Sequence, residues 1–297
     1  MRFIPLRFRL QKTFAHPPPP TVDKSAPVRY NINNNGSGSL VKNTRSEPGT
    51  ADGKRNTMVD AEDLEFEQDI ISSGYHIAVP VQIEKKTTGQ LRIIAYSFVM
   101  EKAREFEEKH GDDPFSADAL AFLDQNIAPP MIALEYSAEH AAERIFLEYR
   151  CENADKSKIL PECELISSLD GEEWDESLEL DAFELDAENR IDRMAVERDG
   201  SGRIVCYAGL DDVCENDGLL EVTVECAPEY RHRGYGTSCV ARLTDHLLSI
   251  GEKVKYVCEE DNRLSKLTAE SAGYTLYKTV LPYVCYKHGR DGSEEED

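Results

Sequence analysis

The sequence predicts a mixed α/β (α+β) fold, and two observations carry that prediction. Between about residues 193 and 288, strand-like and helix-like patterns follow one another in the order β-β-β-α-β-α-β. An earlier block, residues 58–160, also mixes apolar alternation with helical periodicity. A strongly acidic stretch, residues 161–192, separates the two blocks, and we expect it to be a connector with a solvated surface or a docking segment for a basic partner.

Charge divides the chain into unlike segments. The 297 residues carry a formal net charge of −23, yet residues 1–57 hold ten Lys/Arg against three Asp/Glu. The rest of the chain is therefore strongly acidic, and such a surface repels a phosphate backbone. This balance argues against nucleic-acid binding and favours a cationic small molecule or peptide as partner.

Residues 1–57 are expected to be a disordered leader, because the proline run Pro17–Pro20 and the polar stretch Asn31–Ser39 cannot bury a core. The first twelve residues are basic and free of acid. That composition is compatible with a transit peptide, and equally with an untargeted leader or an extension upstream of Met58. The acidic tail, residues 289–297, is expected to be solvated.

The eight cysteines carry no metal-binding spacing, since no Cys-x-x-Cys pair and no matching His pair is present. We therefore expect buried free thiols, no metal, and a reducing, cytoplasmic location. A run of about 18 apolar residues is also lacking, so no membrane-spanning helix is expected.

The first block is expected to fold into alternating elements without a catalytic signature. The patterns predict strands over Ile77–Ile83 and Met131–Tyr136, and helices over Leu91–His110, over residues 117–126 behind a Ser116 cap, and over Ala138–Tyr149. In the connector, Trp174 is interpreted as an anchor for packing, with a substrate lid as the alternative.

The second block is more regular. The predicted strands are Met194–Arg198, Arg203–Leu210, Leu219–Cys226, Lys253–Cys258 and a last pair within Tyr274–Lys287. The predicted helices are Thr237–Ile250 and Arg263–Ala272, each followed by a glycine.

The candidate ligand-binding residues lie in the turn between the third strand of this block and its first helix, Arg231-His232-Arg233-Gly234-Tyr235-Gly236. Glycines let a backbone approach a ligand closely, and free N–H groups at a helix start attract an anion. Two arginines add positive charge, so a phosphate or pyrophosphate is the expected ligand. The third glycine of a dinucleotide fingerprint and the Gly-Lys-Ser/Thr of a P-loop are both absent.

Arg231-x-x-Gly234-x-Gly236, with Ala-Pro-Glu-Tyr before it and a helix after it, resembles motif A of the GNAT superfamily of acyl-CoA-dependent N-acetyltransferases. Downstream, Val257–Asn262, Ser265 and Gly273-Tyr274 are similar to the second half of that family's fold. The resemblance covers about residues 190–287. It implies a twisted mixed sheet with a splayed strand pair flanked by helices, acetyl-CoA as co-substrate, and no metal.

The resemblance also implies roles for individual residues. The strand residues Val224, Glu225 and Cys226 would line the pantetheine arm, with the contacts made by backbone groups at Val224 and Cys226. The amides from His232 to Thr237 would bind the pyrophosphate, beside Arg231 and Arg233, and Asn262 would lie near the far end of the cofactor. Glu221 is the expected general base, with Glu225 as its competitor and an exposed strand carboxylate as the alternative interpretation.

One position departs from the family pattern. Ala269 stands where many relatives carry a tyrosine that acts as general acid. Water, Tyr274 or a side chain from the first block would have to replace it, unless the thiolate leaves without an acid. Tyr274 is favoured as a packed aromatic.

Three functions follow as hypotheses. The leading one is transfer of an acetyl group from acetyl-CoA to a primary amine. The alternatives are a non-catalytic acyl-CoA-binding or regulatory module, motivated by Ala269, and an interaction protein in which residues 60–190 do the work.

Overall fold

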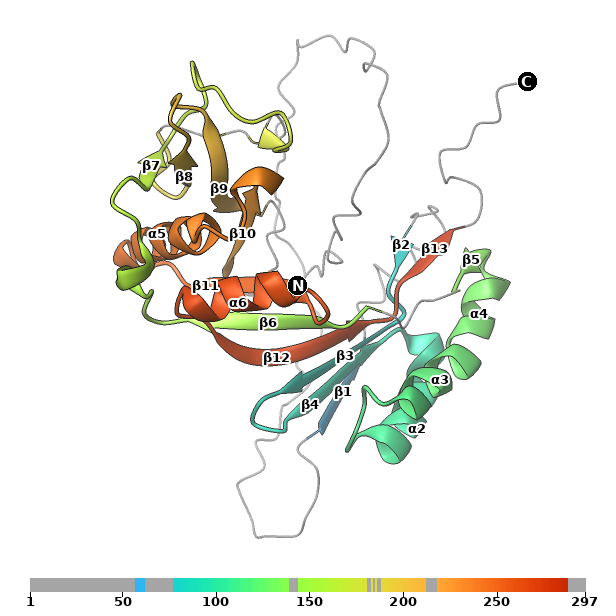
Figure 1. The fold of residues 1–297 in the computed structure, drawn as a ribbon. Coiled ribbons are helices and arrows are strands. Elements are labelled where there is room, and N and C mark those ends of the chain that lie inside the picture. The colour runs from blue at the N-terminus through green and yellow to red at the C-terminus, as the bar shows by residue number, and fades with distance from the viewer. Residues whose placement is uncertain are drawn as a thin grey trace, which may run out of the picture. The chain divides into compact units, whose positions relative to one another are not determined.

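The computed structural model describes residues 57–61, 77–138, 144–180, 183, 185, 188–211 and 218–287 (Figure 1). The predicted leader up to residue 56 and the predicted tail lie outside these residues. The described part mixes helices and strands, which confirms the expected α/β class. No helix within it is long and apolar enough to cross a membrane.

The elements are as follows. The strands are β1 (Thr57–Ala61), β2 (Ile77–Ala78), β3 (Val81–Lys86), β4 (Leu91–Ala95), β5 (Tyr136–Ser137), β6 (Phe146–Cys151), β7 (Glu164–Ile166), β8 (Met194–Arg198), β9 (Ile204–Leu210), β10 (Leu220–Cys226), β11 (Val254–Glu259), β12 (Thr275–Pro282) and β13 (Cys285–Lys287). The α-helices are α2 (Met100–His110), α3 (Ala117–Asn126), α4 (Ala128–Ala133), α5 (Tyr235–Ser249) and α6 (Arg263–Ser271), with short 3-10 turns η1 (Ser97–Val99), η2 (Lys156–Lys158) and η4 (Pro228–Tyr230).

Within the described residues, ten strands form one sheet in the order β1-β4-β3-β12-β6-β11-β10-β9-β8-β7. Its pairs are antiparallel except for β1 with β4 and β10 with β11. A smaller sheet joins β2, β13 and β5. The expected mostly antiparallel sheet with one parallel pair at the predicted site is therefore confirmed.

Strand β6 has an unexpected position. It belongs to the earlier block in sequence, yet it lies between β11 and β12 and pairs antiparallel with both (Figure 1). Four consecutive residues of this strand, Phe146 to Tyr149, are buried, so its side chains are covered on both faces of the sheet. The middle of the sheet thus combines strands from both halves of the sequence.

Three predictions for the earlier block were wrong. Residues 91–95 form β4 instead of the start of a helix, because the β-branched pair Ile93-Ile94 is buried against β3. The predicted strand over Met131–Tyr136 is replaced by α4 over residues 128–133 and the two-residue β5, because Pro129 and Pro130 stand in the first turn, where proline starts a helix and does not break one. The predicted helix over 138–149 ends in strand β6, and its residues 139–143 lie outside the described part.

Other predictions were confirmed to within two residues. Ser116 caps α3, its hydroxyl accepting a hydrogen bond from the Ala119 amide. All strands and helices predicted from residue 194 onward are present. The predicted strand over 77–83 is divided at Pro80 into β2 and the start of β3.

The core falls into three clusters of buried apolar side chains. The first joins β3, β4 and helices α2–α4 with Leu281, Tyr283 and Cys285 from the chain's last strands. The second lies where α5 packs on β8, β9 and β10. The third covers the opposite face of those strands and receives Trp174. The predicted ligand loop lies at the end of β10, beside the second cluster.

Candidate functional site

Strands β10 and β11 separate soon after they meet. They pair in parallel only at Leu220 with Val254 and Glu221 with Lys255. From Val222 onward β10 pairs with β9, while β11 stays paired with β6 as far as Glu259. The predicted splayed pair is therefore present, with Glu221 at the point of separation.

The loop that follows β10 is held by its own aromatic residues. Pro228 begins η4, and the Tyr230 amide donates to the carbonyl of Ala227. The Tyr230 ring stacks on Tyr235 with 6.5 Å between centroids, and its hydroxyl donates to Asp199 Oδ2 at 3.3 Å. The loop is thus anchored to the first turn of α5 and to the β8–β9 turn.

The loop backbone has two left-handed residues before the uncapped start of α5. His232 and Gly234 have positive φ angles of 63° and 85°, and α5 begins at Tyr235 without a side-chain cap. The first N–H groups of a helix have no intrahelical acceptor, and a turn that alternates right- and left-handed residues gathers such groups into a concave nest. The predicted amides from His232 to Thr237 all belong to this segment.

The two arginines stand at the edge of the nest. Arg231 Nε donates to the Cys226 carbonyl at 3.0 Å, and Arg233 Nη2 donates to the Glu229 carbonyl at 3.0 Å. The Arg233 guanidinium also lies over the Tyr230 ring, 4.9 Å from its centroid. Both side chains are exposed. A guanidinium has five N–H groups, so these contacts orient the arginines and leave donors for an anion.

The two glycines of the motif differ in backbone conformation and in the space around them. Gly234 has the left-handed backbone that a side chain rarely adopts, and a Cβ there would meet open space. Gly236 has an ordinary helical backbone, and its Cβ would lie 3.7 Å from Val224 Cγ2. The geometry thus explains Gly234 by conformation and leaves the space beside it open to a ligand.

Glu221 lies next to a buried cation. Its carboxylate Oε2 is 3.6 Å from Nζ of Lys255, its partner across the parallel pair. The Glu221 side chain is 12% exposed and that of Lys255 is 1% exposed. A carboxylate at the mouth of the splayed pair can accept a proton, and the ammonium favours its charged, basic form.

Glu225 is engaged elsewhere. Its Oε2 accepts hydrogen bonds from the Tyr207 hydroxyl and from the Glu179 amide, both at 3.1 Å. Val224, one residue earlier, points toward α5. Cys226 packs in the same cluster, and its hydrogen bond to the Cys206 thiol, together with burial, raises its pKa.

The downstream residues have structural contacts. Asn262 precedes α6, and its Oδ1 accepts from the Ser265 amide at 3.0 Å, so it is the helix cap. Ala269 is fully buried in α6. The Tyr274 hydroxyl shares a 2.7 Å hydrogen bond with Thr244 in the core, and burial raises its pKa. Tyr274 is a packed aromatic, as favoured.

Trp174 is half-buried in the third cluster and forms a bridge to Ile204 at the start of β9. This position fits the anchor interpretation.

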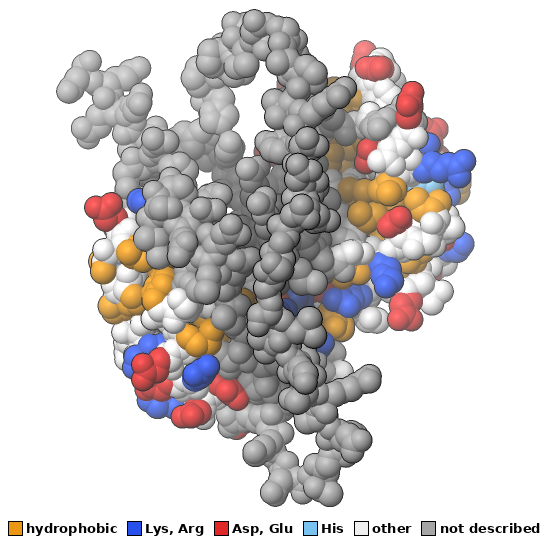
Figure 2. Space-filling model, turned by 180° about the vertical axis from the view of Figure 1, so that it is seen from behind, with side chains coloured by type: hydrophobic (Ala, Val, Ile, Leu, Met, Phe, Trp, Pro, Cys, Tyr) orange, Lys and Arg blue, Asp and Glu red, His pale blue; other side chains and the backbone are white. Residues whose placement is uncertain are grey.

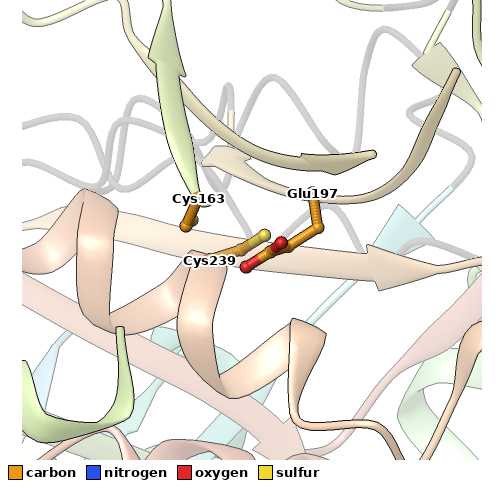
Figure 3. A group of neighbouring side chains, drawn as sticks. All are labelled: Cys163, Glu197 and Cys239. Carbon is orange, nitrogen blue, oxygen red and sulfur yellow. The ribbon is translucent and has the colours of Figure 1, made fainter. Parts of the chain in front are cut away.

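One side-chain group had no signal in the sequence. Cys163, Glu197 and Cys239 are far apart along the chain, but their ligand-type atoms all lie within 4.8 Å of one another (Figure 3). All three are buried. Metal-ligand spacing along the sequence could not reveal them, because each comes from a different segment.

The face that Figure 2 shows carries both positive and negative side chains. There, basic and acidic side chains of the described residues are interspersed, with hydrophobic side chains between them.

Comparison with known proteins gives matches among solved structures alone: no family model matches the sequence, and no curated protein does. A GNAT-family protein from Novosphingobium aromaticivorans is 20% identical, with 49% of this chain and 66% of that chain covered and a TM-score of 0.37. A GNAT-family acetyltransferase from Colwellia psychrerythraea is 12% identical, with coverages of 48% and 55% and a TM-score of 0.34. A GCN5-related N-acetyltransferase from Sphaerobacter thermophilus is 13% identical, with coverages of 69% and 76% and a TM-score of 0.38.

This chain covers less than two thirds of the first two of these proteins. All three are GNAT or GCN5-related proteins, the family whose motif A the loop sequence resembles.

Proposed function

We propose that the chain binds acetyl-CoA at the turn between β10 and α5 and transfers the acetyl group to a primary amine. One observation carries the proposal: β10 and β11 separate after Glu221, and β10 then leads through a short loop into α5, an uncapped helix that begins directly after the left-handed Gly234. A gap between strands accepts an extended pantetheine arm, and the nest at the helix start accepts a pyrophosphate.

The chemistry then follows from the position of Glu221. The amine nitrogen attacks the thioester carbonyl, the C–S bond breaks, and coenzyme A leaves as a thiolate. Glu221 takes the proton that the amine loses, directly or through a water molecule. Lys255, at 3.6 Å, keeps this carboxylate charged between turnovers.

A second candidate is supported by the absence of a tyrosine acid. The family position holds the buried Ala269, and Tyr274 is bound to Thr244 inside the core. A thiolate is a tolerable leaving group, so we favour transfer in which water protonates it. An acyl-CoA-binding module without turnover is the alternative.

The acceptor is proposed from charge. A chain with a formal net charge of −23 attracts cations, which favours a polyamine-like molecule or a basic peptide over an acidic acceptor. All seven cysteines that the structure describes are free, which suits a reducing, cytoplasmic setting.

The test is calorimetric titration of the full chain with acetyl-CoA, using a matched pair of glycine variants. Gly234→Asp places a carboxylate at the nest, while Gly251→Asp makes the same change at the other end of α5, where φ is 91° and the space is also open. Both variants carry a similar backbone strain, about 1–2 kcal/mol. We expect Gly234→Asp alone to weaken binding, by about 100-fold or more, roughly 2.8 kcal/mol.

Equal affinity of the two variants would refute the site, and no binding by the wild-type chain would refute the function. Thiol release with a panel of amines then separates the two candidates. Turnover supports the transferase, and tight binding without turnover on any amine supports the binding module.

A further inference from the structure

Cys163, Glu197 and Cys239 converge beneath the first turns of α5. Cys163 immediately precedes β7, Glu197 lies in β8, and Cys239 is the fifth residue of α5. In Figure 3 the Cys239 sulfur and the Glu197 carboxylate point toward one another, with Cys163 beside them. Their exposed fractions are 7%, 2% and 0%, so the group is enclosed by protein.

The Glu197 carboxyl group has hydrogen-bond partners, and it forms no ion pair with any residue that the structure describes. Ser238 Oγ donates to Glu197 Oε1 at 2.7 Å and itself accepts from the Leu160 amide at 2.9 Å. The Cys163 thiol is a second hydrogen-bond partner of Glu197. A buried carboxylate is stable when a cation balances it, and otherwise it holds a proton.

Thiolates and carboxylates are ligand types that zinc accepts, and this group offers three of the four ligands that a structural zinc ion takes. A tetrahedral zinc ion, with bonds of about 2.3 Å to sulfur and 2.0–2.2 Å to oxygen, holds its ligand atoms about 3.6–3.8 Å apart. The present atoms lie within 4.8 Å of one another, so a shift of about 1 Å at most would bring them to ligand distance.

We infer that Cys163, Glu197 and Cys239 form a structural binding site for zinc. The inference does not depend on the acetyl-CoA site. It differs from the expectation of no metal, which rested on the spacing of residues along the sequence.

Zinc binding releases three protons to solvent. Two come from the thiols, including the one that Cys239 donates to the Cys206 carbonyl at 3.7 Å, and the third is the proton that the buried Glu197 carboxyl holds when no cation balances it. The ion and its three anionic ligands then carry a net charge of −1. Cys206 is the register partner of Glu197 across β8 and β9, and its thiol is hydrogen-bonded to Cys239, so it is a candidate for a fourth ligand. The bound ion would fasten α5 to both β8 and the segment before β7.

The experiment measures zinc in the full chain, produced in zinc-supplemented medium and purified without chelator, by mass spectrometry of the element. The ligand variants are Glu197→Gln and the double change Cys163→Ser with Cys239→Ser. Cys285→Ser is the control, since that thiol is buried in the first cluster, away from the site. We expect about one zinc per wild-type and control chain and far less in the ligand variants.

A chelator should also lower the melting temperature of the wild-type chain and of Cys285→Ser, and not that of a folded ligand variant. The wild-type measurement is decisive even if the double variant does not fold. A wild-type chain that carries no zinc after refolding with an excess of the ion would overturn the inference. A disulfide between Cys163 and Cys239, or equal loss of zinc from Cys285→Ser, would do the same.

Discussion

Glu221 and Glu225 lie on the same face of β10, yet their neighbours give them different tasks. Glu225 accepts two hydrogen bonds from Tyr207 and Glu179, which fixes it as a structural acceptor. Glu221 stands where the strands part, with the cation of Lys255 beside it. At the scale of single residues, this difference favours Glu221 over Glu225 as the proton acceptor of the proposed reaction.

Replacing Glu221 by Gln should therefore slow catalysis and leave cofactor binding unchanged. We expect kcat to fall by about 10²- to 10⁴-fold, the usual contribution of a general base. Steady-state kinetics by thiol release and calorimetric titration with acetyl-CoA measure the two effects. Glu225→Gln is the matched change on the same strand, and it should lower stability and keep the turnover of the folded enzyme. Full kcat in Glu221→Gln would remove Glu221 from the mechanism.

At the scale of elements, the turn between β8 and β9 supports the loop between β10 and α5. Asp199 Oδ1 accepts from the Ser201 amide and hydroxyl, and Oδ2 accepts from Arg203 and from the Tyr230 hydroxyl. The hydrogen bonds from Ser201 and Arg203 hold the pKa of Asp199 below its ordinary value of 3.8. The charged form of this carboxylate is therefore the one that holds the turn and, through Tyr230, the loop.

The lowered pKa predicts a dependence of stability on pH. Above pH 3.8 Asp199 is charged in both the folded and the unfolded chain, so its stabilisation is complete there. As pH falls below that value, the unfolded chain takes up the proton first and the stabilisation is lost. The gap in melting temperature between wild type and Asp199→Asn should therefore shrink below about pH 4. The exposed Asp170→Asn should run parallel to wild type, and a constant gap for Asp199→Asn would contradict the assignment.

At the scale of the whole molecule, a buried charge cluster joins strands that are distant in sequence. Lys278 of β12 contacts Glu84 of β3 at 3.0 Å and Glu148 of β6 at 3.1 Å. Burial lowers the pKa of Lys278, but the two carboxylates outweigh it and the pKa is raised. Glu148 is further held by Arg150, which stacks on the Tyr277 ring.

Removing only the cation should be costly. Lys278→Met leaves two carboxylates buried without it, and breaking such a cluster typically costs about 3–5 kcal/mol. Urea unfolding measures the loss. The triple variant with Glu84→Gln and Glu148→Gln should recover most of it, because no buried carboxylate is left without a cation. Arg150 loses Glu148 in this variant, but its side chain is 37% exposed and still stacks on the Tyr277 ring. Lys109→Met, at the exposed pair with Glu105, is the surface control and should change little. A Lys278→Met chain as stable as that control would show that the cluster contributes nothing.

The sequence predicted the second block well and the first block poorly, for physical reasons. From residue 194 onward the strands are short, glycines mark the turns, and α5 has a clear apolar face, so local pattern and fold agree. In the first block, β6 pairs with strands remote in sequence, and β4 pairs with the neighbouring β3 and the earlier β1, and the local helical pattern reports none of these pairings. At the site, the loop follows from its own residues, whereas the ion pair of Glu221 and the group around Glu197 depend on the register between strands.

The position of β6 in the sequence delays its pairing during synthesis. Its partner strands begin about 100 residues later in the chain, and at ribosomal rates of about 5–20 residues per second they emerge roughly 5 to 25 seconds after it. During that interval both edges of this largely apolar strand are unpaired, and unpaired edges can pair with strands of other chains. Until β11 and β12 have been synthesised, the charges of Glu148 and Arg150 on this strand oppose such pairing.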